Sequence, residues 1–98
     1  MNFMQISEFQ RLMRDLYSEN DKRRGPTATT LWLVEEVGEL AEAIRRDDRE
    51  NLRAELADCF AWIGALANLY DIDLEEVFCE KYPDSCPTCG MKPCICTD

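Results

Sequence analysis

The sequence predicts an all-α protein, an antiparallel helical bundle that is completed by oligomerisation and followed by a small C-terminal tail. Three observations indicate this fold class. Glycine and proline are sparse through the first 80 residues, and no alternation of apolar and polar residues persists as a strand would require. Apolar residues instead recur every three or four positions, which is the spacing of amphipathic helices. A length of 98 residues allows one domain rather than two.

The first helix is expected over residues 7–19. Residues 7–10 (Ser-Glu-Phe-Gln) fit a capping box at its start. Apolar residues recur at helical spacing in this segment, namely Ile6, Phe9, Met13 and Leu16. Residues 20–29 are polar and contain Gly25-Pro26, so a loop is expected there.

Two long helices are expected next, over residues 28–46 and 49–70, joined by a short turn at Asp47-Asp48. The earlier helix has an apolar stripe at Leu33, Val37, Ala41 and Ile44. The later helix has its own stripe at Leu52, Leu56, Cys59, Ile63, Leu66 and Tyr70. Asp73 has the character of an N-cap for a further short helix, which runs to about Lys81 before Pro83 ends it.

The longest apolar run, residues 59–67, contains no polar side chain. This part of the helix is therefore apolar all round, whereas a surface helix of a monomer shows a polar stripe. We expect a second subunit to cover it, which predicts a homodimer or a homotetramer; burial by the chain's own helices is the alternative. Cys59 and Cys79 lie on apolar helical faces and are expected to be buried small hydrophobic residues.

The composition excludes several classes of protein. Eleven basic residues against 20 acidic ones give a formal net charge of −9, whereas binding a nucleic-acid backbone needs a basic face. The chain has no histidine, which excludes Ser–His and Cys–His nucleophile pairs. No run approaches the ~18 apolar residues of a membrane span, and residues 1–5 do not resemble a signal peptide. We therefore expect a cytoplasmic protein that binds neither polymeric nucleic acid nor a membrane.

The tail, residues 84–98, is expected to be a metal-binding appendage to a bundle of residues 1–83. It contains four of the six cysteines, which are Cys86, Cys89, Cys94 and Cys96. Residues 86–90 (Cys-Pro-Thr-Cys-Gly) are typical of a zinc-knuckle turn, and four thiolates match tetrahedral Zn²⁺ in a reducing compartment. Iron in a four-sulfur site and a redox disulfide pair remain the alternatives. Four thiolates leave no position on zinc open for water, so a structural or interaction role is expected.

Acidic residues form two sets on the two long helices. The sets are Glu35, Glu36 and Glu39 on the earlier helix, and Glu55 and Asp58 on the later one. Side chains three or four residues apart project from the same helix face. Glu39 precedes Asp47 by eight residues and Glu55 follows it by eight, so an antiparallel hairpin places the two sets at similar height.

Carboxylates that converge without a basic partner repel one another, and a divalent cation among them removes this repulsion. Sites made only of oxygen ligands suit Mg²⁺ or Mn²⁺. Mg²⁺ held in this way keeps positions for water and for substrate phosphate oxygens, so the pattern indicates phosphate chemistry. The alternative is that the acidic residues are solvated faces of charged helices.

Residues 31–44 (LWLVEEVGELAEAI), followed by residues 54–58 (AELAD), resemble the MazG-like all-α nucleoside triphosphate pyrophosphohydrolases. The pattern of that family is E-E-x-x-E followed after a gap by E-x-x-D, and 15 residues separate Glu39 from Glu55 here. The resemblance covers about residues 5–82.

This resemblance implies hydrolysis of a (deoxy)nucleoside triphosphate to the monophosphate and pyrophosphate with Mg²⁺, by dimers or tetramers that often clear non-canonical nucleotides. By position, the implied metal ligands are Glu36, Glu39, Glu55 and Asp58. Glu35 matches a more variable glutamate of the family. It is the candidate catalytic residue that holds a second metal ion, orients water or takes a proton from it.

Five further residues are candidates for substrate contacts. Lys81 ends the last helix, where the family often places a basic residue, and Arg24 belongs to the basic run before the motif helix. Asn68 lies ten residues beyond Asp58, on about the same helix face. Trp32 and Trp62 each lie four residues from a motif carboxylate and offer stacking surfaces for a base. Exposed, solvated or core positions are the structural alternatives for all five.

Two other functions remain open from the sequence. One is a bundle that binds nucleotides without hydrolysing them. The other is a zinc-knuckle module whose acidic bundle binds a protein partner. The preferred base and sugar depend on pocket walls contributed by both subunits, which motif spacing does not determine.

Overall fold

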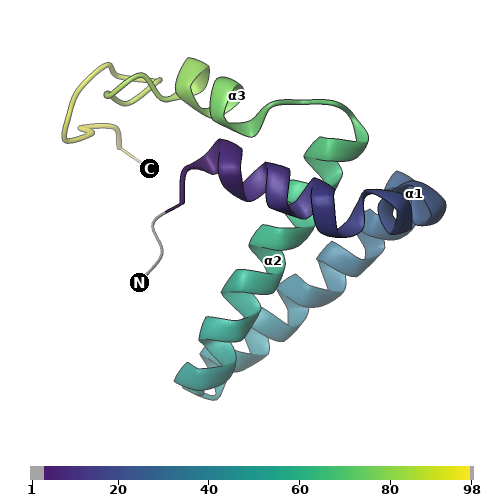
Figure 1. Ribbon diagram of the computed structural model, residues 1–98. Coiled ribbons are helices and arrows are strands. Elements are labelled where there is room, and N and C mark those ends of the chain that lie inside the picture. The colour runs from purple at the N-terminus through teal and green to yellow at the C-terminus, as the bar shows by residue number, and fades with distance from the viewer. Residues whose placement is uncertain (1–3, 98) are drawn as a thin grey trace.

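The computed structural model describes residues 4–97, which form three helices, α1 (Ile6–Arg45), α2 (Arg49–Leu69) and α3 (Leu74–Lys81). The described residues contain no strand, so the all-α prediction is confirmed. Figure 1 shows that the first part of α1 crosses the molecule and that its second part runs beside α2. Residues 1–3 and 98 lie outside the described residues. Most of residues 1–5, which are not expected to form a signal peptide, therefore also lie outside them.

The prediction of a loop over residues 20–29 is wrong, because α1 is helical on both sides of a single break at Gly25. Gly25 has φ 81° and ψ 168°, a region of backbone space that is essentially restricted to glycine. Pro26 follows as the first residue of the second helical segment, where its missing N–H costs no hydrogen bond. The helix therefore bends sharply at one peptide unit instead of unwinding over ten residues.

The side chains around this break explain why the polar segment stays helical. Asp21 and Arg24 form an ion pair one turn apart before the break. Arg24 Nε donates to Thr29 Oγ1 at 3.0 Å, and Thr29 Oγ1 donates to the Gly25 carbonyl at 2.7 Å. Asp21 and Thr29 are both fully buried. These contacts join the two segments of α1 across the bend.

The turn between α1 and α2 confirms the expected antiparallel hairpin. Asp47 adopts a left-handed conformation with φ 52°, and Asp48 caps α2 by accepting the Asn51 amide at 3.2 Å. Asp73 caps α3 in the same way, accepting the Glu76 amide at 3.1 Å. The short helix to Lys81 is therefore confirmed as well. At the start of α1, by contrast, the capping residue is Gln5 rather than Ser7, and Glu8 accepts its amide.

Small side chains fill the narrow core. The buried apolar residues are Ala43, Cys59, Ala65 and Ala67, and they allow the helices to approach closely. Gly64 lies directly under Phe9 of the first α1 segment, since a Cβ at Gly64 would come within 2.7 Å of the Phe9 ring. Gln10 is also buried, and its amide nitrogen donates to the Ile72 carbonyl at 2.7 Å. The first segment of α1 is thereby held across the end of α2.

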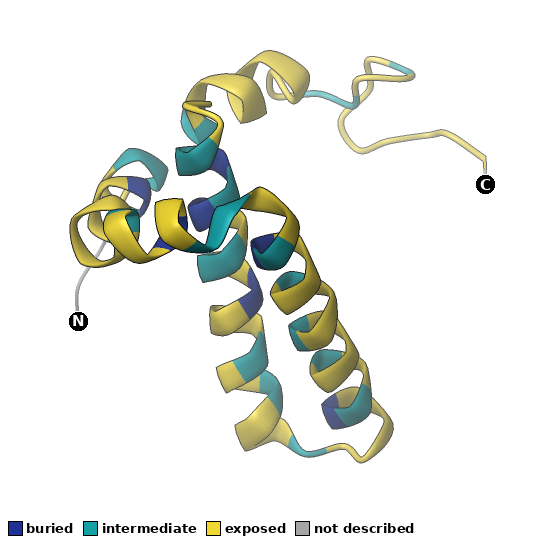
Figure 2. Ribbon diagram, turned by 90° about the vertical axis from the view of Figure 1, so that its right-hand side faces the viewer, coloured by how far each residue is buried: buried dark blue, intermediate teal, exposed yellow. Residues whose placement is uncertain are grey.

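The outer face of the hairpin is apolar and exposed. Figure 2 shows the buried and half-buried positions of α1 and α2 turned toward the seam between them, with exposed positions outside. The exposed apolar residues on the hairpin include Leu31, Val34, Val37, Ile44, Leu56, Phe60 and Ile63. Several of these belong to the apolar stripes that the sequence indicates, so a single chain leaves part of each stripe exposed. Cys79 is likewise exposed, which corrects the expectation that it is buried, whereas Cys59 is buried as expected.

Replacing Gly25 by alanine is expected to destabilise the protein by ~1–3 kcal/mol, because an alanine side chain does not fit the backbone conformation at the break. Gly38→Ala is the matched control, since Gly38 is helical and no atom lies within 4 Å of an added Cβ. It is expected to stabilise the protein by up to ~1 kcal/mol. Thermal unfolding followed by circular dichroism measures both, and equal effects in the two variants contradict the assignment of the break.

The exposed apolar face predicts self-association, because a second copy of the hairpin would bury the same stripes. Val34→Lys and Leu56→Lys should shift the mass measured by light scattering from a dimer or larger species toward one chain. Ala54→Lys is the control, since Ala54 is exposed on the other side of α2 and the substitution adds the same charge. A wild-type protein that stays monomeric at high concentration contradicts the prediction.

Candidate active site and metal centre

Two glutamates occupy interior positions in the seam of the hairpin. Along the second segment of α1, the less exposed positions include Leu33, Glu36, Leu40 and Ala43. Along α2 they include Leu52, Glu55, Cys59 and Trp62. Each series has the three-or-four spacing of a buried helix face, so Glu36 and Glu55 stand where a simple bundle would have apolar residues. Their carboxyl groups therefore face each other between the two helices.

Glu39 joins this pair. One carboxylate oxygen from each of Glu36, Glu39 and Glu55 lies within 4.8 Å of the other two. The structure thus brings together three of the four residues that the sequence indicates as ligands for a divalent cation. Asp58 is exposed and does not complete this group, although its charge is close enough to act on Glu36.

The pKa of Glu36 is raised to about 7. The largest cause is a side-chain hydrogen bond with Glu55, followed by burial and by repulsion from Glu55, Glu39 and Asp58. The Oε2 atoms of Glu36 and Glu55 are buried and have no hydrogen-bond partner. Buried, unpartnered carboxylate oxygens are costly, and a divalent cation would satisfy them.

The donor set fits a hard cation. The three converging groups offer oxygen atoms only, which is the ligand type that Mg²⁺ and Mn²⁺ prefer. Cys59 is buried beside them, and burial together with the neighbouring carboxylates raises the pKa of its thiol. A thiol kept protonated in this way is a poor metal ligand, so the cluster does not favour a soft metal.

Glu35 precedes Glu36 on α1 and is exposed. Consecutive residues on a helix point about 100° apart around its axis, so Glu35 lies beside the seam rather than in it. Its carboxylate is accessible to solvent, and it is not one of the three converging groups.

Arg24 and the two tryptophans form one contact group. The Arg24 guanidinium lies 4.7 Å from the centre of the Trp62 ring, and the rings of Trp32 and Trp62 stack with centroids 6.4 Å apart and planes 8° from parallel. Arg24 also binds Asp21 and Thr29. The residue that the sequence indicates as a substrate contact thus already holds the bend of α1 together.

A groove beside this group contains Asp58. It is lined by Tyr17, Asn20, Arg24, Asp58, Ala61 and Trp62. Tyr17 and Asn20 belong to the first α1 segment, from which the sequence indicated only Arg24 as a substrate contact. They were missed because only the bend at Gly25 brings this segment over α2.

Asn68 and Lys81 have other surroundings. Asn68 Oδ1 accepts hydrogen bonds from Gln10 and Arg14 at 3.0 and 3.1 Å, so it ties α2 to the first segment of α1. Lys81 is exposed at the end of α3, with its Nζ 5.8 Å from the centre of the Tyr82 ring. Figures 1 and 2 both show α3 apart from the hairpin that carries the carboxylates. In one chain, neither residue joins the three converging glutamates.

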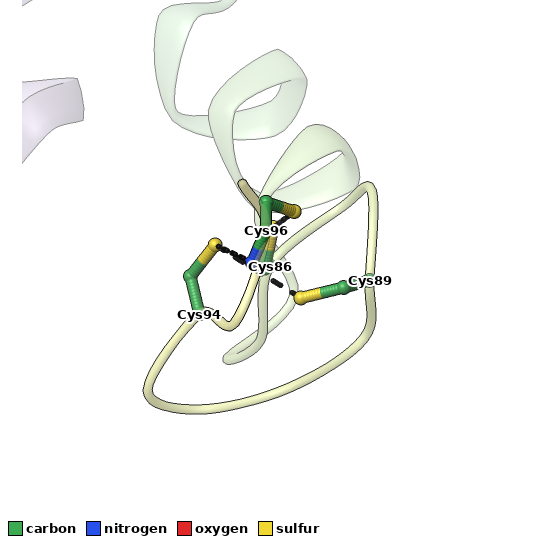
Figure 3. A group of neighbouring side chains, drawn as sticks. All are labelled: Cys86, Cys89, Cys94 and Cys96. Atoms are coloured by element: carbon green, nitrogen blue, oxygen red, sulfur yellow. Dashed lines mark hydrogen bonds between the residues drawn. The ribbon is translucent and has the colours of Figure 1, made fainter. Parts of the chain in front are cut away.

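The cysteines of the tail form a second cluster. The Sγ atoms of Cys86, Cys89, Cys94 and Cys96 all lie within 4.8 Å of one another, and Figure 3 shows the four side chains converging from two stretches of the tail. All four are free thiols. The pKa of Cys86 is lowered to about 6, chiefly because the backbone N–H groups of Cys89 and Thr88 donate to its sulfur.

Comparison with known proteins identifies the family of the chain. The family model described as "MazG nucleotide pyrophosphohydrolase domain" matches residues 24–90, which is more than half of the chain and includes both acidic sets. The chain belongs to this family. It is also similar to the protein named "Uncharacterized protein YvdC" of Bacillus subtilis (strain 168), with 31% identity over 91 residues that cover 76% of this chain and 86% of the relative.

Membership of the MazG family indicates nucleotide pyrophosphohydrolysis as the general class of activity and a nucleoside triphosphate as the general class of substrate. The resemblance of the two acidic motifs to this family is therefore confirmed.

Of the helices in residues 4–97, none has the length and apolar character needed to span a bilayer.

Replacing Glu36 by glutamine is expected to stabilise the protein in EDTA above pH 7. A raised pKa means that the folded state binds the Glu36 proton more tightly than the unfolded state does, so this group destabilises the fold once it is ionised. We expect a gain of about 1 kcal/mol or more, or roughly 4–8 °C in Tm. The exposed Glu35→Gln is the control and should change Tm little. A lower Tm for Glu36→Gln contradicts the proposed repulsion.

Proposed function

We propose that this protein is a hydrolase that depends on a divalent cation and converts a (deoxy)nucleoside triphosphate to the monophosphate and pyrophosphate. One observation carries the proposal. Three carboxylates converge in the seam of a MazG-family hairpin, and two of them have buried oxygens without a partner. Such an arrangement is costly by itself, and it becomes useful when it binds a cation together with a polyphosphate.

In this proposal Glu36, Glu39 and Glu55 hold Mg²⁺ or Mn²⁺, and Asp58 is the fourth ligand that the family pattern assigns. When bound, the cation offsets the charge of the phosphate oxygens and makes the attacked phosphorus more electrophilic. Glu36 and Glu55 are half-buried and supported by the seam, which favours a rigid ligand geometry.

Glu35 is the proposed general base. Glu35 precedes the ligand Glu36 on α1 and its carboxylate is exposed, so in this proposal it accepts a proton from the water that attacks the phosphorus. The bond between phosphorus and the leaving pyrophosphate oxygen breaks as the new phosphorus–oxygen bond forms. The monophosphate keeps the oxygen that the water supplies.

The groove next to Asp58 is the proposed place for the nucleoside. Trp62 lines the groove and offers an aromatic surface for a base, and Trp32 stacks on Trp62 and extends this surface. Asn20 offers an amide with both donor and acceptor groups. Arg24 is already engaged by Asp21 and Trp62, so we assign it the role of fixing this wall. A second subunit on the apolar hairpin face would supply further walls. Clearing of non-canonical nucleotides, a contribution of Lys81 or Asn68 from that assembly, and a cytoplasmic location stay predictions.

The central test is release of pyrophosphate from a panel of canonical, deoxy- and modified nucleoside triphosphates with Mg²⁺ or Mn²⁺. Glu39→Gln and Asp58→Asn should each lower the rate by roughly 100-fold or more, because the cation supplies several kcal/mol of transition-state stabilisation. EDTA should abolish release. Glu42→Gln is the matched control on the same helix, since Glu42 is paired with Arg45 and Arg46.

Each other outcome has a defined meaning. Full activity of Glu39→Gln or Asp58→Asn, with helicity unchanged, rejects that residue as a metal ligand. Tight binding of nucleotides without pyrophosphate release favours a non-catalytic nucleotide-binding bundle. Neither binding nor turnover, together with loss of a protein partner in Cys89→Ser, favours the zinc-knuckle interaction module.

A further inference from the structure

The four-cysteine cluster in the tail lies outside the chemistry of the carboxylates. The family match ends at residue 90, so it includes Cys86 and Cys89 but not Cys94 and Cys96. Residues 82–97 form no helix or strand, and most of their side chains are exposed. Something other than a hydrophobic core must hold this segment in one shape, because a segment this short buries too little apolar surface.

The distances between the sulfurs identify the kind of site. The Sγ atoms of Cys86 and Cys96 are 3.8 Å apart, and those of Cys89 and Cys94 are 3.9 Å apart. A tetrahedral zinc site with Zn–S bonds of ~2.3 Å has sulfur–sulfur edges of about 3.8 Å. A disulfide requires ~2.05 Å. The cluster thus has the dimensions of a four-thiolate metal site and not of two disulfides.

The backbone is shaped to support thiolates at these positions. The Gly90 amide donates to the Cys86 carbonyl at 2.7 Å, and the Cys86 amide donates to the Met91 carbonyl at 3.0 Å. Gly90 has φ 73°, which lets the chain turn back after Cys89 without steric cost. This tight turn directs the amides of Thr88 and Cys89 at the Cys86 sulfur.

Cys94 and Cys89 also accept hydrogen bonds from backbone amides. The Cys96 amide lies 3.3 Å from Cys94 Sγ and donates to it. The amides of Met91 and Ile95 donate to the Cys89 sulfur. These donors lower the pKa of the Cys86 and Cys89 thiols and so favour the thiolate form that binds a metal ion. Hydrogen bonds with the other three cysteine side chains raise the pKa of Cys96 to about 11.

The cluster is joined to α3 through one aromatic residue. Tyr82 stacks on Phe78 of α3, with ring centroids 5.1 Å apart. Tyr82 also lines a shallow apolar hollow with Pro87, Met91 and Pro93 of the tail. A metal ion that closes the cysteine loop would therefore keep these apolar side chains against the end of α3.

We propose that Cys86, Cys89, Cys94 and Cys96 bind one Zn²⁺ ion in a closed tetrahedral site that orders residues 84–97 against Tyr82. Zinc takes the place of the thiol protons, which are released on binding. No ligand position is left for water or substrate, so the site is structural. This site is independent of the proposed hydrolase function, since none of its ligands belongs to the carboxylate cluster.

The test is metal analysis of the full chain purified under reducing conditions. We expect about one zinc per chain by mass spectrometry, and a Co²⁺-substituted protein with the visible absorption of tetrahedral cobalt–thiolate. Cys94→Ser should lose most of the bound metal. Cys79→Ser is the matched control, because Cys79 is an exposed free thiol outside the cluster and its loss should leave the zinc content unchanged.

Limited proteolysis provides a readout that depends on order in the tail and not on hydrolysis. Removing zinc with a strong chelator, or introducing Cys94→Ser, should accelerate cleavage in residues 84–97 while the helical circular dichroism signal is retained. Iron in place of zinc, two disulfides under these conditions, or metal content unaffected by Cys94→Ser would overturn the proposal. So would a tail whose cleavage rate is the same with and without zinc.

Discussion

The carboxyl groups of Glu36 and Glu55 face each other between α1 and α2, and the rest of the structure depends on this constraint. Two carboxyl groups face each other where apolar side chains would stabilise the hairpin, and the pKa of Glu36 is raised to about 7 as a result. The hairpin must therefore be held together by other means. Small residues such as Ala43 and Cys59 let the helices approach closely, and Asp48 caps the start of α2.

The bend at Gly25 supplies further support. It turns the first segment of α1 across α2, where Phe9 lies over Gly64 and Gln10 binds the segment between α2 and α3. Arg24, which is paired with Asp21, donates to Thr29 across the bend. One glycine conformation thus stabilises the end of the hairpin and also completes the groove beside Asp58. Stability and the proposed nucleoside site share the same contacts.

The core of this short chain leaves two parts of the molecule without enough apolar burial, the outer face of the hairpin and the cysteine tail. The exposed apolar stripes of the hairpin are suited to a second copy of the chain, and the four thiols of the tail are suited to a metal ion. Both are ways in which small domains compensate for limited burial. The acidic balance of the chain is consistent with this, because the carboxylates that cost stability are the ones that we propose as ligands of a divalent cation.

The sequence by itself determined the features that depend on local spacing. The helical periodicity, the turn at Asp47-Asp48 and the two acidic motifs lie within a few turns of one another along the chain, so helix geometry alone relates them. Only the tertiary structure decided that residues 20–29 stay helical and that Asn68 and Arg24 are engaged by other side chains. Asn68 contacts Gln10 and Arg14, and Arg24 contacts Trp62, because the bend at Gly25 places the first α1 segment against α2. The angle of that bend depends on packing between segments that are distant in sequence.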